Sequence, residues 1–157
     1  MTITVRPGEP EDEATVNAVD ALSTATLRKT YRPNQAALAN KARMTTLLNR
    51  LVALCDGLIV GTVQWTLEDK CLGIVGLGVH PDFRRRGIAR ELLAYLSTMG
   101  RQMGATRLRL YTVKETGNVD VFARLGFHVV AEREDRFSES DQHRTLTEVE
   151  LELSLHG

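Results

Sequence analysis

The chain has 157 residues, with 20 basic and 20 acidic side chains and a formal net charge of zero. Because the charges balance, nothing in the composition favours a nucleic acid or an anionic membrane as partner. This length supports one sizeable hydrophobic core and is short for two ordinary domains. We therefore expect a single domain over residues 1–157 that acts on a small molecule or a protein.

Membrane insertion, export and metal binding have no support in the sequence. No apolar stretch approaches the roughly 20 residues that a membrane helix needs. The first residues, MTITVRPGEP, lack the basic and apolar regions of a secretory signal. Cys55 and Cys71 have no metal-ligand spacing and are too few for a disulfide framework, so we predict two reduced core residues. We expect a cytoplasmic protein that binds no metal and no membrane.

The first third of the chain predicts a strand followed by two helices. Residues 3–6 are rich in β-branched side chains and stop at Pro7-Gly8, which predicts an edge strand ended by a turn. Apolar side chains recur with helical spacing over residues 11–22 and again over residues 33–48. The segment between the two helices follows neither the helix nor the strand period.

A hairpin and a central strand are predicted next. Residues 51–54 and 58–67 flank Asp56-Gly57, a dipeptide suited to the positive φ angles of a tight turn. Residues 71–79 are almost all apolar and include three glycines. This combination predicts a central strand that is buried on both faces and approached closely by a ligand.

The longest helical pattern starts at Gly87 and stops at Gly104, a residue type that commonly ends helices. Its apolar residues recur at three- and four-residue spacing: Ile88, Leu92, Tyr95, Leu96, Met99 and Met103. Residues 107–113 then alternate between two kinds of side chain, which predicts a strand with two unlike faces.

The end of the chain predicts a short helix and two strands. The helix begins at Asn118, a candidate N-cap, and ends at Gly126. Residues 127–131 and 146–155 are the two closing strands, joined by the polar segment 133–144. The complete order is a strand, two helices, a three-strand meander, then helix, strand, helix and two strands. This order implies an α/β fold of the mixed (α+β) kind, with helices on the faces of a mixed sheet.

The most informative junction is HPDFRRRGIA, residues 80–89, where the central strand leads into the longest helix. The first turn of a helix presents backbone N–H groups without intrahelical partners, and the helix dipole adds partial positive charge. Gly87 lets a phosphate approach the backbone, and the three arginines that precede it supply forked, charged donors. The spacing differs from the Walker and dinucleotide-binding motifs. We predict an anion site suited to a pyrophosphate, with a solvated basic loop as the alternative.

The segment Arg84-x-x-Gly87-x-Ala89 resembles the Gln/Arg-x-x-Gly-x-Gly/Ala signature of the GNAT family of N-acetyltransferases. The preceding LGVHP, which ends at Pro81, and the Leu-Gly-Phe at residues 125–127 are similar to the family's segments at the same places. The resemblance is strong over residues 71–127, and the first 50 residues match mainly in the order of elements. It implies a mostly antiparallel sheet of about seven strands whose central strands splay around acyl-CoA.

The same resemblance implies an acetyl-CoA-dependent N-acyltransferase, which moves an acetyl group to a primary amine of a small molecule or peptide by direct attack. Acetyl-CoA would lie between the strand that ends at Val79 and the strand that ends near Val113. Backbone groups of three residues would pair with the pantetheine arm: Leu77, Gly78 and Val79. The signature would bind the pyrophosphate with its arginine side chains and its backbone N–H groups: Arg84, Arg85, Arg86, Gly87, Ile88, Ala89 and Arg90.

The general base expected from the resemblance is missing. Some relatives carry a glutamate six residues ahead of the last aliphatic residue of the central strand, and this position is Gly73. A lysine-like amine with a pKa near 10.4 is neutral in only about one molecule in a thousand near pH 7.4, so deprotonation is a real requirement. Four other residues are candidates, although each is more often a surface residue: Glu68, Glu115, Glu132 and His143.

The expected general acid is missing as well. Many relatives have a tyrosine four residues before the glycine of Leu-Gly-Phe, and here that residue is Phe122, which can pack against the pantetheine but has no proton to give. Tyr111 on the preceding strand is a weak candidate for this role, with half-buried packing as the alternative. Asn118 would hydrogen-bond the cofactor, or serve only as a helix cap.

Two other functions remain open at this point. The departures at Gly73 and Phe122 allow a CoA-binding module that regulates or senses without turnover. A strand-loop-helix anion site could also belong to an unrelated nucleotide or phosphate binder. For a transferase we expect the acceptor near residues 27–33 and 133–144, the least patterned segments. Exposed strand edges make a homodimer a reasonable expectation.

Overall fold

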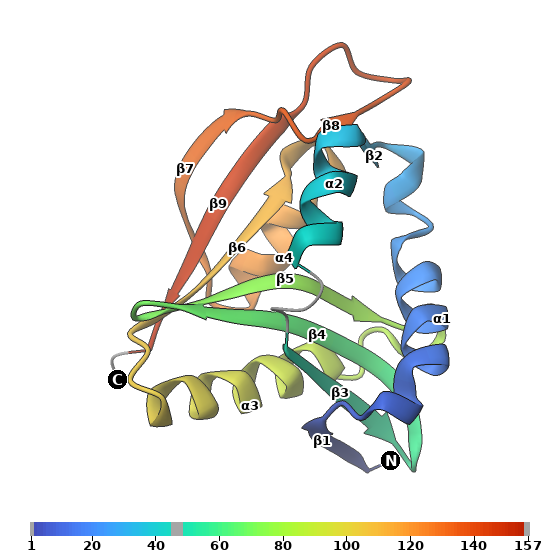
Figure 1. Ribbon diagram of the computed structural model, residues 1–157, viewed down its shortest axis with the longest axis vertical. Helices are drawn as coiled ribbons and strands as arrows, with labels where there is room; N and C mark the ends of the chain where they lie inside the picture. Colours follow the sequence, from blue (N-terminus) through green and yellow to red (C-terminus); the bar gives the residue numbers. More distant parts are fainter. Residues whose placement is uncertain (1, 45–48, 156–157) are drawn as a thin grey trace.

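The computed structural model describes residues 2–44 and 49–155, and within these ranges seven strands form one mixed sheet (Figure 1). In spatial order the strands are β1 (Ile3–Pro7), β3 (Asn49–Cys55), β4 (Leu58–Glu68), β5 (Cys71–Val79), β6 (Arg107–Val113), β9 (Thr147–Ser154) and β7 (His128–Glu134). Neighbouring strands are antiparallel except β5 and β6, which are parallel. The predicted sheet is confirmed, and β1 lies at its edge as expected.

Helices cover both faces of this sheet, as predicted. They are α1 (Glu13–Thr24), α2 (Gln35–Met44), α3 (Ile88–Gln102) and α4 (Asn118–Arg124), with short 3-10 turns η1 (Pro10–Asp12), η2 (Leu27–Lys29), η3 (Pro81–Phe83) and η4 (Lys114–Thr116). The second predicted helix was expected to reach residue 48, and its last four residues lie outside the described ranges.

Two adjacent residues of β4 show that α1 and α3 lie on opposite faces. A Cβ added to Gly61 would press on Ile88 of α3. The next residue, Thr62, pairs with Gly78 in β5 and faces the other way. A Cβ added to Gly78 would collide with Ser23 of α1. The glycine at position 78 therefore makes room for a helix, so this close approach to the strand is by α1 and not by a ligand.

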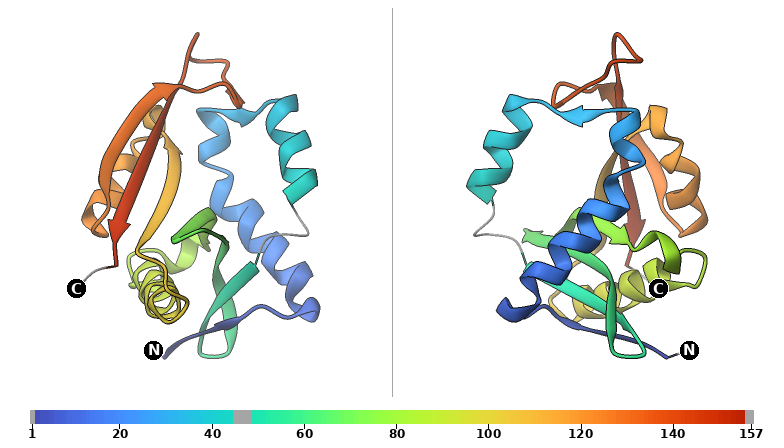
Figure 2. Two further views of the ribbon diagram at one scale, coloured as in Figure 1. Left: turned by 60° about the vertical axis from the view of Figure 1, so that its left-hand side comes forward. Right: turned by 90° about the vertical axis from the view of Figure 1, so that its right-hand side faces the viewer.

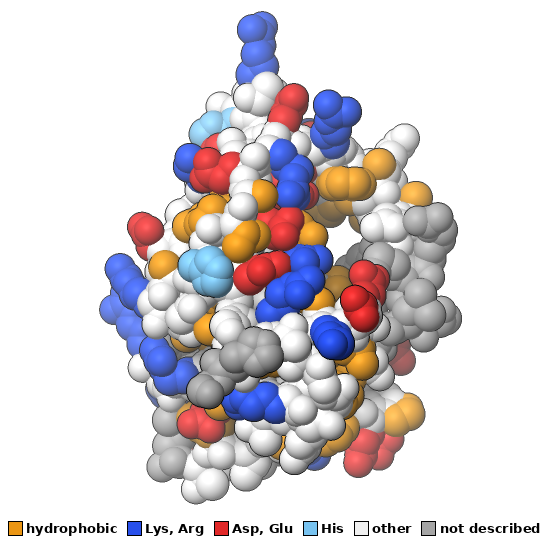
Figure 3. Space-filling view, turned by 90° about the vertical axis from the view of Figure 1, so that its left-hand side faces the viewer, with side chains coloured by type: hydrophobic (Ala, Val, Ile, Leu, Met, Phe, Trp, Pro, Cys, Tyr) orange, Lys and Arg blue, Asp and Glu red, His pale blue; other side chains and the backbone are white. Residues whose placement is uncertain are grey.

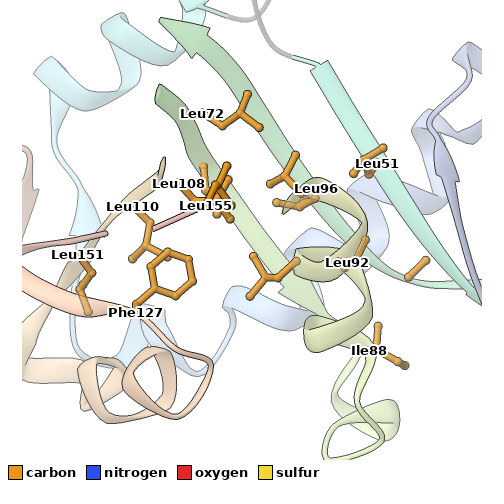
Figure 4. Packing of buried hydrophobic residues seen from close by; sticks show 14 of the residues in the cluster. Leu51, Leu72, Ile88, Leu92, Leu96, Leu108, Leu110, Phe127, Leu151 and Leu155 are labelled. Carbon is orange, nitrogen blue, oxygen red and sulfur yellow. The ribbon is translucent and has the colours of Figure 1, made fainter. Parts of the chain in front are cut away.

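The hydrophobic core lies between α3 and the sheet and continues to β9 and the start of β7 (Figure 4). Leucine side chains from α3 and the neighbouring strands fill it, and each buried leucine stabilises the fold by roughly 1.5–3 kcal/mol. The buried face of α3 differs from the predicted one, because Tyr95 and Met103 are exposed whereas Leu93 and Gly100 are buried. No helix in the described part of the chain is long and apolar enough to cross a membrane.

The predicted hairpin and the core position of the two cysteines are confirmed. Asp56 and Gly57 join β3 to β4 with φ angles of 51° and 88°, the left-handed conformations that a tight hairpin turn needs. Cys55 and Cys71 are free and buried. Burial raises the pKa of the Cys71 thiol above its ordinary value, so this side chain behaves as a small apolar residue.

The parallel pairing of β5 with β6 ends soon after it begins. Three residue pairs connect the strands, the last being Gly73 with Arg109. Just beyond, Gln64 of β4 pairs with Gly76 whereas Trp65 pairs with Ile74, so Val75 is the extra residue of a β-bulge. From this point β5 diverges from β6. The prediction of a strand buried on both faces is therefore wrong for its second half, where the Val75 side chain is 48% exposed.

The last third of the chain departs from prediction in two places. Gly117, with φ of 81°, is the N-cap of α4, and the Asn118 N–H donates to Thr116 Oγ1 over 3.2 Å. Asn118 is therefore not the N-cap, because the preceding glycine adopts the left-handed conformation more easily. The polar segment 133–144 contains a further short strand, β8 (Ser138–Glu139), which pairs with β2 (Arg32–Pro33).

Candidate functional site

A pocket of about 950 Å³ opens where β5 and β6 diverge. Five of the residues predicted from sequence contribute to its lining, from three different elements: Leu77 and Gly78 in β5, Tyr111 in β6, and Asn118 and Phe122 in α4. Val79 does not line it, and its side chain packs against the core. The structure thus brings two of the three predicted pantetheine positions, Leu77 and Gly78, together with the candidate acid in one pocket.

The predicted pyrophosphate loop connects β5 to α3 outside this pocket. After η3 the backbone passes through Arg85 with φ of 64° and Gly87 with φ of 81°. Gly87 is the N-cap of α3, and its carbonyl accepts the N–H of Glu91 over 2.9 Å. The N–H groups that precede Glu91 in the first turn are directed out of the helix end. A Cβ added to Gly87 would meet nothing within 4 Å, so the space beside the helix end is open.

The side chains of the loop have separate roles. Arg84 Nη2 donates to the carbonyl oxygen of Ser23 over 3.2 Å, which ties the loop to the end of α1. The Arg86 guanidinium lies 5.0 Å from the centre of the Phe83 ring. Ile88 is buried against the core and fixes the start of α3, whereas Arg85 and Arg90 are exposed. The helix end is therefore held by apolar packing and surrounded by positive charge.

The four residues named as alternative bases lie away from the pocket. Glu115 Oε1 accepts the N–H of Thr147 over 2.7 Å, and Glu132 forms an ion pair with Lys114 at 3.3 Å. Glu68 ends β4, and His143 lies in the exposed segment between β8 and β9. Among the described residues, none of these four lines the pocket, so the geometry favours none of them as base.

Three carboxylates that sequence reasoning missed do line the pocket: Asp20, Asp135 and Glu148. Asp20 Oδ2 lies 3.5 Å from Arg50 Nη1, and Glu148 Oε1 lies 2.6 Å from Arg133 Nη1. Asp20 follows the buried Val16 and Val19 on α1, where the helical spacing alone gives no sign of a pocket. Glu148 could have been found, because β9 places a glutamate at every second position.

Glu148 is one of three glutamates on β9 that form a ladder of ion pairs across β6, β9 and β7. Glu148, Glu150 and Glu152 pair with three arginines of the neighbouring strands: Arg107, Arg109 and Arg133. Hydrogen bonds to Glu150 and Glu148 raise the pKa of Arg133 above its ordinary value. Figure 3, viewed from the β7 side, shows acidic and basic side chains intermixed on the surface. The Arg133 guanidinium also lies 5.9 Å from the centre of the Tyr111 ring.

A bridge joins the two segments that the sequence left without a pattern. We define the bridge as the β2·β8 pair and its flanking contacts; in Figure 2 the β7–β9 connection reaches across to the segment before α2. Arg32 forms ion pairs with Glu139 at 3.1 Å and Asp141 at 3.0 Å. Asn34 Nδ2 donates to the carbonyl oxygen of Arg136 over 2.8 Å. Because Tyr31, Phe137 and Ser138 line the pocket, the bridge spans one end of it.

Comparison with known proteins places these features in a family. The model of the acetyltransferase (GNAT) family matches residues 18–127. The ribosomal-protein-S18-alanine N-acetyltransferase of Escherichia coli is similar in structure, with a TM-score of 0.76 and 15% identity over 98% of this chain and 94% of its own.

Two further similar structures contain the cofactor. YncA of Salmonella typhimurium, with acetyl-CoA, gives a TM-score of 0.71 and 20% identity over 100% of this chain and 96% of its own. The PaiA N-acetyltransferase of Thermoplasma acidophilum, in complex with coenzyme A, gives a TM-score of 0.73 and 16% identity over 98% of this chain and 99% of its own.

The fold and the divergent central strands define an acyltransferase architecture. The match over residues 18–127 shows that the chain belongs to the acetyltransferase (GNAT) family. The protein is accordingly an acetyl-CoA-dependent acyltransferase.

Proposed function

We propose that the enzyme transfers an acetyl group from acetyl-CoA to a primary amine of a small molecule or peptide by direct attack. The observation that carries this proposal is the divergence of β5 from β6 after three residue pairs, which opens the pocket. Beyond Gly73 the edge of β5 that faces β6 has no strand partner in the described part of the chain. Its backbone groups need hydrogen-bond partners, and an amide-containing pantetheine arm supplies them.

The donor fits the residues at both ends of this edge. Leu77, Gly78 and Val79 offer the backbone groups, and the pyrophosphate would accept from the N–H groups of residues 85–90. Gly87 leaves open space beside those N–H groups. The arginines at 84–86 and Arg90 add positive charge. Asn118 and Phe122 would lie beside the arm near the thioester.

The reaction in this pocket would be transfer of the acetyl group from the thioester to the amine. The amine nitrogen forms a bond with the acetyl carbonyl carbon, the carbon–sulfur bond breaks, and CoA leaves with the sulfur's electron pair. A thiol pKa near 8.5 makes this thiolate a tolerable leaving group. The ammonium form must lose one proton before attack, at a cost of about 4 kcal/mol near pH 7.4 for a lysine-like amine. After the bond forms, the nitrogen loses a second proton to solvent or to the departing thiolate. Asp20 and Glu148 both lie beside arginines, so we assign deprotonation mainly to solvent, with activity rising toward the amine pKa.

A CoA-binding module without turnover is the second candidate. Two observations favour it: position 73 is glycine, and Phe122 lines the pocket where a tyrosine would supply a proton. This candidate predicts binding of acetyl-CoA without any amine-dependent release of thiol.

Thiol release from acetyl-CoA with a panel of small amines, amino acids, aminoglycosides and peptides separates the two candidates. We expect amine-dependent release for at least one acceptor class, and binding that coenzyme A competes for better than ATP or NAD. Binding without release for the whole panel would support the non-catalytic module. Equal competition by ATP and coenzyme A would contradict a CoA site altogether.

We further propose that residues 1–157 act as one cytoplasmic domain, alone or as a homodimer. One core cluster draws residues from Leu51 to Leu155, which favours a single domain. Two free buried cysteines suit a reducing compartment. The strands β1 and β7 end the sheet on either side, and such edges can pair between copies.

A further inference from the structure

In the part of the chain whose side chains are described, six charged side chains line the pocket, and all but one have evident local partners. Arg50 lies 3.5 Å from Asp20, and Arg133 lies 2.6 Å from Glu148. Asp135 accepts the N–H of Phe137 over 2.7 Å and is part of that turn. The sixth is Arg28. Among residues 2–40 and 49–155 Arg28 has no carboxylate or hydrogen-bond partner. The three arginines of the lining equal its three carboxylates in number, and Arg28 is the arginine whose guanidinium is left available to a ligand.

The position of Arg28 suits it to bind an anion. It belongs to η2, and its guanidinium lies 5.2 Å from the centre of the Tyr31 ring, which also lines the pocket. In a contact of this kind the face of the guanidinium packs on the ring, and the N–H donors at its edge remain available to a ligand. Those donors match the two oxygens of a carboxylate.

We propose that the acceptor is a small amine that carries a carboxylate, with Arg28 as the residue that recognises the carboxylate. The inference rests on the proposed acetyl transfer and names the acceptor class for the same pocket. The amine would reach the donor between Gly78 and Tyr111, and the carboxylate would remain at the η2 side. Arg28 contributes a positive charge, and the carboxylate of the acceptor contributes the matching negative charge.

The bridge lies at one end of the pocket and favours a small acceptor. The pocket is lined by Tyr31 on one side of the bridge and by Phe137 and Ser138 on the other. Beside them, Ser140 Oγ donates to the carbonyl oxygen of Thr30, which further closes this end. A side chain on a folded protein that entered at this end would have to open the bridge, at a small cost in free energy, whereas an amino acid would not.

The test compares one carboxylate-bearing amine with its primary amide, for example glycine with glycinamide and β-alanine with β-alaninamide. For each pair, kcat/KM is measured by thiol release in the wild type, in Arg28→Gln and in Lys29→Gln. Lys29 is the matched control, because it is the next cation along η2, is exposed and does not line the pocket. Comparing ratios between variants removes the difference in amine pKa within each pair.

We expect the acid-to-amide ratio of kcat/KM to fall about tenfold or more in Arg28→Gln, the size of one charge-assisted contact, and to stay the same in Lys29→Gln. Acetyl-CoA affinity, measured separately, should be equal in all three proteins. A ratio that Arg28→Gln leaves unchanged, or transfer to peptides but to no acidic amine, would overturn the inference and leave acetyl transfer intact. Absence of transfer to every amine would overturn both proposals.

Discussion

Most of the predicted donor site comes from one continuous stretch of chain, to which α4 adds Asn118 and Phe122, whereas the acceptor side is assembled from segments far apart in sequence. Residues 71–102 supply β5, the arginine loop and α3 without interruption. On the acceptor side, the hydrogen bond between Arg32 and Glu139 joins residues 107 positions apart. A local segment folds into its shape from its own sequence, but a bridge between distant segments exists only once the whole fold is in place.

The two sides also differ in what stabilises them. Buried apolar side chains hold the donor side, where Ile88 and Leu92 anchor the start of α3 in the core. Exposed ion pairs and single hydrogen bonds hold the bridge, and an exposed ion pair contributes only about 0–1 kcal/mol. The bridge should therefore open locally at little cost, while the donor side stays folded until the protein unfolds. The following changes test this difference, in order of expected effect.

Gly87→Glu should abolish donor binding. The new side chain would put a negative charge where the pyrophosphate lies, and the Kd for acetyl-CoA should rise more than about a hundredfold. Acetyl-CoA at a hundred times its Kd should stabilise the wild type by about 2.7 kcal/mol and the variant by almost nothing. Thermal unfolding with and without acetyl-CoA measures both.

Gly104→Glu is the matched control for this variant. Gly104 follows the other end of α3 with φ of 83°, and an added Cβ there also meets nothing within 4 Å. The control thus carries the same charge and the same backbone strain away from the predicted phosphate site. Retained micromolar binding in folded Gly87→Glu would remove the arginine loop from the donor site.

The same contrast explains how much the sequence could predict. The strand, the loop and the helix of the donor side follow from local signals, such as the apolar run of β5 and the glycine before α3. The bridge gives no such signal, because β2 and β8 are two residues long and pair across the chain. Asn118 shows a limit even for local signals: asparagine is a good N-cap, yet Gly117 takes that position with φ of 81°.

Tyr111 lies where the two sides meet, and we expect it to have a moderate role in catalysis. Its side chain lines the pocket and is 52% exposed, so water can reach the leaving sulfur beside it. Because a thiolate with a pKa near 8.5 leaves without prior protonation, Tyr111→Phe should lower kcat at most about tenfold. Phe122→Tyr should likewise change kcat by less than about tenfold.

Thiol release at saturating acetyl-CoA measures kcat for both variants, and the Kd for acetyl-CoA serves as the control. A hundredfold loss in Tyr111→Phe with unchanged Kd would make Tyr111 the general acid. The acid would then lie on β6 and not on α4, where the family resemblance led us to expect it.

Asn34→Asp should weaken the bridge and leave the donor side unchanged. Aspartate keeps the oxygen that accepts the N–H of Ala37 over 3.0 Å but loses the Nδ2 donor to Arg136. One hydrogen bond contributes about 0.5–1.5 kcal/mol, so the acceptor KM should rise about two- to tenfold, with the Kd for acetyl-CoA unchanged. Gln35→Glu adds the same charge one residue later and should change neither constant. An equal rise in acceptor KM in both variants would mean that the added charge, and not the lost hydrogen bond, causes the effect.

Asp12 directly precedes α1, and α1 carries pocket residues such as Asp20. Arg6 donates to the buried Asp12 carboxylate at 2.7 and 3.1 Å, and the N–H of Glu9 donates at 2.8 Å. These hydrogen bonds, the one from Arg6 first, hold the pKa of Asp12 below its ordinary value.

A carboxylate whose pKa is lower in the folded state stabilises the fold above its unfolded-state pKa of about 3.9, and the stabilisation is lost as the pH falls through the folded-state value. Asp12→Asn should therefore lower Tm by a few degrees at pH 7, and its difference from the wild type should shrink as the pH falls below about 4. Glu13→Gln, an exposed change in the first turn of α1, is the control and should show little pH-dependent difference. A difference between wild type and Asp12→Asn that stays constant down to pH values near 3 would mean that packing, and not the ion pair with Arg6, fixes the start of α1.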